Sequence, residues 1–221
     1  METAISETLK QLIPSFKVGV ITYHDIVVSD SPQLIKGKLA YFKEALMLEL
    51  EEKTVGELSG VAEWRQIFKT IGTDPSRYRP SQEALLRRFQ KGQAFPFIHS
   101  AADINNYFSA RFEIPMGIYD LDNIKENVMI RIGTSEDVYE GINGRQLNMS
   151  QKIISADQES AFGSPIVDSK RTMTTPQTRN ALQIVYLKPS ENLENSHKLL
   201  KAISELFVQV NGGEASYEII E

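Results

Sequence analysis

The segment from residue 96 to residue 131 limits the fold most, because a helix pattern, a helix break and a strand pattern follow one another in it. Apolar residues recur at three- and four-residue steps over 101–112, which is typical of an amphipathic helix. Pro115 and Gly117 then predict a tight turn, since proline lacks a backbone N–H and glycine adopts angles that other residues avoid. Alternating apolar residues over 128–132 predict a strand.

Most of the predicted helices precede most of the predicted strands along the chain. A first strand is expected over 16–28, and helices over 33–53, 61–70 and 81–91. The later strands are expected at 128–132, 138–142, 145–147, 153–157, 181–187 and 215–220, with a polar loop over 162–178 and a closing helix over 192–210. This order favours an α+β fold over a regular alternation. We find no repeat or linker, so a single domain over 1–221 is expected.

Composition limits the function classes. A hydrophobic content of 41% and a charged content of 24% are ordinary for a soluble globular protein. The sequence has no apolar run of membrane-spanning length and no signal-peptide pattern, so we expect a cytoplasmic protein without a membrane partner. The absence of cysteine excludes disulfides and thiolate catalysis. A net charge of −5 means that an RNA partner would need a local basic patch.

Metal and nucleotide motifs are missing from the sequence. His24, His99 and His197 are far apart, and none has a partner at ligand spacing. Asp120 and Asp122 resemble the start of a calcium loop, but the glycine and glutamate that such a loop requires are absent. No phosphate-binding glycine motif is present. We therefore expect no metal, no cofactor and no ATP-dependent ligation.

A series of residues in this central segment resembles the tRNA-binding editing domain, the B3/B4 domain, of the bacterial phenylalanyl-tRNA synthetase beta subunit. The matching residues are Asp103, Asn106, Tyr107, Pro115, Met116, Asp120 and Arg131. The similarity covers about 61–213 and is greatest to small stand-alone proteins that carry this domain. It implies a three-layer α+β fold with a β-sandwich of unusual topology and flanking helices, on which the strand and helix of 1–60 pack.

The resemblance also implies a chemistry, the removal of wrong amino acids from tRNA. The family has an arginine before the helix, a histidine in the turn and a glutamate on a late strand. The matching positions in this chain are Pro96, Gly117 and Ile184, so all three polar residues are missing. The phenylalanine specificity of the family is therefore not carried over, and whether this chain hydrolyses an ester stays open.

We expect a pocket between residues 96–120 and 163–178. His99 and Asp103 are the catalytic candidates, with two alternatives: His99 satisfies local backbone, and Asp103 is a first-turn carboxylate that the helix dipole favours. Asn106 is expected to bond the Gly117 turn. Arg171 would hold a carboxylate or a phosphate, unless it is only a surface charge. The pocket or ligand-binding candidates are Asn106, Gly117, Asp120, Asp157, Ser169, Arg171, Thr172 and Thr174.

Two basic runs are candidates for RNA contact, although ordinary solvated charge is the alternative. The predicted RNA-binding residues are Arg77, Arg79, Arg87, Arg88 and Lys170. Three functions stay open at this point. The first is a stand-alone editing-like module that binds the tRNA acceptor end, an amino acid, or both. The second is a hydrolase that acts in trans on misacylated tRNA, and the third is a small-ligand sensor without RNA contact. The sequence identifies neither the amino acid nor the tRNA nor the oligomeric state.

Overall fold

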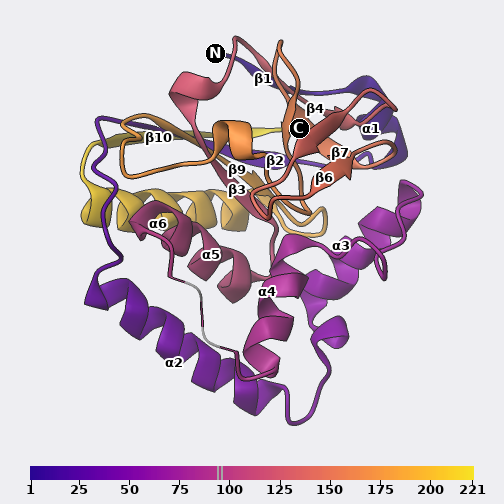
Figure 1. Cartoon of the computed structure of the whole chain (residues 1–221). Helices are drawn as coiled ribbons and strands as arrows, with labels where there is room; N and C mark the ends of the chain where they lie inside the picture. Colours follow the sequence, from indigo (N-terminus) through magenta and orange to yellow (C-terminus); the bar gives the residue numbers. More distant parts are fainter. Residues whose placement is uncertain (94, 96) are drawn as a thin grey trace.

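Two four-stranded sheets form the centre of the computed structural model, which describes residues 1–93, 95 and 97–221 (Figure 1). The first sheet has the order β1 (Thr3–Ile5), β4 (Val128–Ile132), β7 (Ile153–Ala156) and β8 (Ala161–Gly163). The second has the order β10 (Glu214–Ile220), β2 (Val18–His24), β9 (Ala181–Tyr186) and β3 (Met116–Asp120). The β1–β4 pair is parallel, and the other strand pairs of these two sheets are antiparallel.

Strands β3 and β9 of the second sheet are buried on both faces, whereas β10 at its edge is partly exposed. Because side chains alternate along a strand, Leu182, Ile184 and Tyr186 of β9 point to one face and Val185 points to the other. The first group packs with Val128 and other residues of the first sheet. The opposite face packs on helices. A strand that is covered on both sides reads as a continuous apolar run, which explains the predicted strand at 181–187.

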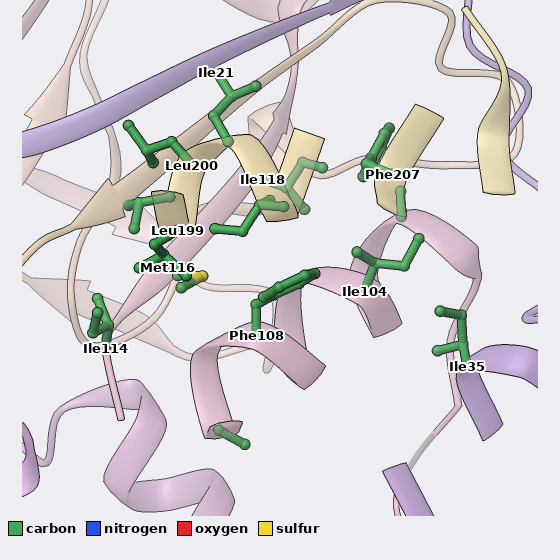
Figure 2. Packing of buried hydrophobic residues seen from close by; sticks show 14 of the residues in the cluster. Ile21, Ile35, Ile104, Phe108, Ile114, Met116, Ile118, Leu199, Leu200 and Phe207 are labelled. Atoms are coloured by element: carbon green, nitrogen blue, oxygen red, sulfur yellow. The ribbon is translucent and has the colours of Figure 1, made fainter. Parts of the chain in front are cut away.

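Helices α5 (Ser100–Phe112) and α6 (Leu193–Asn211) cover the outer face of the second sheet (Figure 1). Figure 2 shows Phe108 of α5 and Leu199 and Leu200 of α6 among the residues packed toward strand residues Ile21 and Met116. Helix α2 (Gln33–Glu49) packs on α5 and lies at the outer margin of the molecule (Figure 1). This arrangement confirms the α+β class.

The remaining elements lie around these layers. Helix α1 (Glu7–Leu12) follows β1, while α3 (Ser59–Thr70) and α4 (Ser81–Gln90) precede α5. Strands β5 (Val138–Glu140) and β6 (Gln146–Asn148) form the predicted hairpin, with Gly144 at a φ of 75°. Short 3-10 helices are η1 (Val55–Glu57), η2 (Leu121–Asn123) and η3 (Lys170–Thr172). Within the described ranges, no helix is both long and apolar enough to cross a membrane.

The predicted turn at Gly117 is wrong. The helix ends at Phe112, three residues before Pro115, and the next residue, Glu113, takes a left-handed φ of 57°; Gly117 lies inside strand β3. Strand β1 and helix α1 were not predicted, because short elements with few apolar residues give weak patterns. The predicted helix at 33–53 ends earlier, at Glu49.

A buried carboxylate joins α3 to α4. Glu83 is fully buried, and both of its oxygens accept hydrogen bonds at 3.0 Å from Arg65 of α3. The Nε of Arg87, one turn further along α4, donates to the same carboxylate at 2.8 Å. Arg87 was predicted to bind RNA, and in the structure its guanidinium is held by this ion pair.

We expect Glu83→Gln to lower the free energy of unfolding by about 3 kcal/mol, because it leaves two arginines beside a buried neutral group. Urea denaturation followed by circular dichroism measures the loss. The control is Glu205→Gln, which removes an exposed pair with Lys201 at 3.8 Å and should change stability by less than about 1 kcal/mol. Equal losses in the two variants would contradict this role of Glu83.

Candidate functional site

His99 caps the N-terminus of α5. Its Nδ1 accepts the N–H of Ala102 at 3.2 Å, and its Nε2 lies 3.0 Å from the carbonyl oxygen of Thr174. A carbonyl oxygen only accepts hydrogen bonds, so Nε2 carries the hydrogen of this bond and donates it, while Nδ1 is the acceptor, which fixes the tautomer. Both ring nitrogens satisfy backbone groups, so the local-backbone alternative for His99 is confirmed. The same two bonds attach the threonine-rich loop to α5.

Asp103 also has structural partners. Its buried carboxylate accepts the Ser31 hydroxyl at 2.5 Å and the Ile98 N–H at 3.1 and 3.2 Å. Burial raises the pKa of Asp103, while these hydrogen bonds act in the opposite direction. The position in the first turn of α5 agrees with the helix-dipole alternative. Asp103 thus fastens the segment before α5 to the one before α2.

The bond predicted for Asn106 is made by its neighbour Asn105. The Nδ2 of Asn105 donates to the carbonyl of Met116 at 3.3 Å, and its Oδ1 accepts from Gln183 at 2.9 Å. The Tyr23 hydroxyl in turn donates to Gln183 at 2.7 Å. Among the residues that the structure describes, Asn106 has no side-chain hydrogen bond. The spacing of apolar residues along the helix could have indicated Asn105, because this residue lies beside Ile104 on the buried face.

Gly117 and Ile184, which match the histidine and glutamate positions of the resembled domain, lie opposite each other on β3 and β9. A side chain at Gly117 would collide with the hydroxyl of Tyr119, and so would one at Gly163 of the first sheet. The phenol of Tyr119 therefore fills the space beside Gly117 between the two sheets. Pro96, the third matching position, lies outside the described residues.

A partly buried acid, Asp168, lies at the end of this phenol. The Tyr119 hydroxyl donates to Oδ1 of Asp168 at 2.7 Å, and the N–H of Ser164 lies 3.5 Å from the same oxygen. Burial raises the pKa of Asp168 to about 7. It also raises the pKa of Tyr119, and the charge of Asp168 adds to that effect. Tyr119 and Asp168 form a pair able to hold a proton near neutral pH, and neither residue was predicted as a site residue.

The remaining loop candidates are held by local contacts. Arg171 makes a two-pronged ion pair with Asp157 at 2.9 and 3.1 Å. Burial acts to raise the pKa of Asp157, but hydrogen bonds from Arg171 and from backbone N–H groups leave it lowered. Asp120 accepts the hydroxyl of Thr178 at 2.6 Å, and Ser169 caps the η3 turn. Thr172 is different, since its buried hydroxyl has no hydrogen-bond partner in the described part of the chain.

In the described part of the chain, several residues expected to line the common pocket bond to other protein groups. Asp157, Arg171 and the Thr174 carbonyl all have protein partners, and Tyr119 fills the space beside Gly117. The loop does border a cavity of about 330 Å³, which is lined by Tyr139, Glu140, Ser160, Ser169, Lys170 and Arg171. No residue of 97–120 lines this cavity. Within the described ranges, no cluster of three or more histidine or acidic side chains is arranged to hold a metal.

Cations gather around Tyr78 in the connection between α3 and α4. Arg77 lies 5.2 Å from the centre of the Tyr78 ring, and the Nζ of Lys152 lies 4.2 Å from it. Burial lowers the pKa of Lys152, and the charge of Arg77 lowers it further. Arg77 and Arg79 are exposed, and Arg88 is exposed further along α4. None of these four cations has a carboxylate within 4.0 Å in the part of the chain that is described, whereas Lys170 pairs with Glu140 at 3.2 Å.

Comparisons with known proteins agree with the resemblance stated above. The sequence matches the family model of the B3/4 domain over residues 63–209. It is 24% identical over 213 residues to the uncharacterized protein YhzB of Bacillus subtilis (strain 168), which covers 96% of each chain. It is 27% identical over 110 residues to the phenylalanine–tRNA ligase beta subunit of Bartonella henselae, covering 49% of this chain and 14% of that subunit.

A solved structure has a similar fold. An N-terminal fragment of the phenylalanyl-tRNA synthetase beta subunit from Pyrococcus horikoshii matches 97% of this chain with a TM-score of 0.50 and 16% identity. The match covers 50% of that fragment, so the chain spans half or less of the synthetase chains it is similar to. These findings confirm the predicted resemblance to a stand-alone protein of this type.

We expect Gly117→Ala to lower the free energy of unfolding by about 1–3 kcal/mol, because the added methyl group meets the enclosed Tyr119 phenol. Thermal and urea denaturation measure the effect. Gly56→Ala is the matched control, since its new methyl group would meet other atoms only at 3.9 Å. A loss in the control as large as in Gly117→Ala would show that Tyr119 does not limit the space.

The raised pKa of Asp168 predicts a pH dependence of stability. In the folded chain the pKa of Asp168 is raised to about 7, whereas the ordinary pKa of an aspartate is 3.8. The folded chain therefore binds this proton more tightly than the unfolded chain, and the bound proton stabilises the fold at low pH. The stability of the wild type relative to Asp168→Asn should therefore fall as pH rises from about 4 to about 7, by at most about 1.4 kcal/mol per pH unit. Urea denaturation at several pH values measures this difference. Asp157→Asn, which removes a carboxylate of lowered pKa, should show no such trend between about pH 5 and about pH 8.

Proposed function

This chain belongs to the B3/4 domain family, and we propose that it is a stand-alone module that binds the acceptor end of tRNA. The observation that carries the proposal is the cation group around Tyr78. The exposed side chains of Arg77 and Arg79 lack carboxylate partners in the described ranges, although the chain has a net charge of −5. Lys152 is buried, and its Nζ donates to the carbonyl of Ser150 at 3.0 Å, so the two arginines are the cations that can reach a phosphate. Uncompensated cations beside an aromatic ring suit a nucleic acid, since they neutralise phosphates while the ring stacks on a base.

The fold supports the same proposal. The two four-stranded sheets and the α5–α6 layer correspond to the β-sandwich and flanking helices that the resemblance implies. The matched proteins from Bartonella henselae and Pyrococcus horikoshii are both named as beta subunits of phenylalanyl-tRNA synthetase, and that name describes an enzyme that joins phenylalanine to tRNA. Since this chain spans only part of those proteins, the activity of the whole synthetase is not proposed for it.

A second candidate function is hydrolysis of misacylated tRNA, and Asp168 favours it. A carboxyl group with a pKa of about 7 is suited to exchange protons at neutral pH. The group lies beside Gly117, where the resembled domain has its histidine. In the structure, Tyr119 encloses it, so hydrolysis requires a form in which the phenol leaves this position. Backbone N–H groups and oriented water would then supply the remaining stabilisation.

We expect tRNA to bind with micromolar affinity at low salt, and the affinity to fall as salt rises, because phosphate contacts release counterions. A gel-shift titration with charged and uncharged tRNA measures this. The double variant Arg77→Glu and Arg79→Glu should weaken binding at least about ten-fold and reduce the salt slope. The control is Lys201→Glu, a charge reversal of an exposed lysine on α6. No retention of either tRNA at micromolar protein would remove the RNA proposal and favour the small-ligand sensor.

The hydrolytic candidate has its own test. The chain should deacylate at least one of a panel of mischarged tRNAs faster than the spontaneous ester hydrolysis. Asp168→Asn should remove that excess rate while tRNA binding is retained, since the side chain of Asp168 is held by Tyr119 and Ser164 and the cations beside Tyr78 are Arg77 and Lys152. If every tRNA in the panel is hydrolysed only at the spontaneous rate, the chain is a binding module and not a hydrolase.

A further inference from the structure

Helix α2 presents a line of large apolar side chains to solvent. Leu34, Tyr41 and Leu48 have exposed fractions of 45%, 76% and 67%. They are spaced by seven residues, which is about two helical turns, so they lie along one side of the helix. The opposite side carries Ile35, Leu39 and Leu46, which are buried in the core. Figure 1 shows α2 at the edge of the molecule, with the rest of the chain on one side only.

This surface is more than a scatter of single apolar residues. Met47 on the same helix is 38% exposed. Ala40, Met47 and Leu48 are among the residues that line a depression of about 500 Å³ on the surface of α2. Phe97, which is 46% exposed, lies next to the N-terminal half of α2, where the Nζ of Lys36 is 5.6 Å from its ring. Aligned exposed apolar residues of this kind mark interaction surfaces.

Small residues separate the large ones. Gly37 lies between Leu34 and Tyr41, and Ala45 lies between Tyr41 and Leu48. A glycine inside a helix costs about 1 kcal/mol relative to alanine, and nothing lies within 4 Å of the place where a Cβ of Gly37 would be. The missing side chain therefore leaves room for another backbone to approach α2 closely at this point.

Two charges flank the line of exposed apolar residues on α2. Lys38 precedes Tyr41 by three residues and Glu44 follows it by three, and the Nζ of Lys38 lies 5.9 Å from the ring of Tyr107 in the same chain. A helix of the same sequence that crosses this face in the same direction as α2 brings like charges together. The opposite direction brings Lys38 of one helix to Glu44 of the other. These two charges are thus complementary to each other only in an antiparallel pair.

We propose that α2 is the interface of a symmetric dimer, in which the α2 helix of a second copy lies antiparallel across Tyr41. Residues at equal distances from Tyr41 then face each other, because a two-fold axis passes through this position. Leu34 faces Leu48 of the partner subunit, and Lys38 faces Glu44 of the partner subunit. Gly37 faces Ala45 of the partner subunit, and these small residues leave room for the partner helix on both sides of the axis. This inference does not depend on the proposed tRNA binding.

The size of the face sets the strength of the dimer. Helix α2 has 17 residues and is therefore about 26 Å long. A single pair of helices of this length gives an interface at the small end of the range for specific complexes. We therefore expect a reversible dimer with a dissociation constant in the micromolar range.

Sedimentation equilibrium of the full chain tests the proposal. The wild type should change from monomer to dimer as its concentration rises through the micromolar range, and Leu48→Glu should raise the dissociation constant at least ten-fold. Ile142→Glu is the matched control, since Ile142 is 54% exposed and lies in the β5–β6 hairpin. Circular dichroism checks that each variant is folded. A wild type that stays monomeric at every concentration, or a dimer that Leu48→Glu leaves intact, would overturn the proposal.

Charge exchange tests the direction of the pair. Lys38→Glu alone and Glu44→Lys alone should each weaken the dimer, since each places like charges opposite one another twice in the symmetric interface. The double variant carries the two charges exchanged and should restore the wild-type constant to within about three-fold, since the opposite charges again face each other. Absence of this restoration would exclude the antiparallel alignment.

Cysteine crosslinking locates the axis. The chain has no cysteine, so an introduced thiol has no competitor. Tyr41→Cys should form a disulfide between two copies under mild oxidation, because both copies of this residue lie at the axis. Leu48→Cys should not, because the two copies of this residue would be about 20 Å apart along the helices. Equal crosslinking by both variants, or none by either, would contradict the geometry.

Discussion

The burial of strand β9 on both faces is the constraint on which the rest of the structure depends. One face of β9 packs toward the first sheet, and the other face packs toward α5 and α6. The single polar residue on the strand, Gln183, needs partners in this interior, and it finds them in Tyr23 and Asn105. These bonds connect β2, β9 and α5. A shift of β9 by one residue would exchange its two faces and break the set of bonds, so the register is strongly determined.

The space between the two sheets explains how this chain differs from the domain it resembles. Two glycines, one on each sheet, leave room for the phenol of Tyr119, and Asp168 accepts a hydrogen bond from its hydroxyl. The chain therefore fills with its own side chain the region where the resembled domain has polar site residues. The acid in this region of the chain, Asp168, lies on the loop after β8 and not on strand β9, which carries Ile184. Any ligand that enters this region must compete with an internal hydrogen bond.

The sequence predicted the long elements well and the site poorly. Periodic apolar residues located α5 and α6, and Asn143-Gly144 located the hairpin, because these signals are local. Gly117 was misread as a turn, since a glycine required by the Tyr119 phenol looks the same in sequence as a glycine required by a bend. Tyr119, Asp168 and Lys152 were missed, because contacts between residues far apart in the chain decide their roles. His99 and Asp103 were located correctly on the helix start, and their backbone roles follow from the cap geometry.

Strands β2 and β10 lie outside the segment that matches the family model, although β2 is the direct neighbour of β9. The region defined by sequence similarity therefore lacks two strands of the second sheet. Because β10 follows α6 in the chain, the sheet gains this edge strand only after the helical layer has been made. Until β10 pairs, the backbone N–H and C=O groups along that side of β2 have no strand partner. An unpaired edge of this kind is a template for pairing with another chain, and β10 removes it.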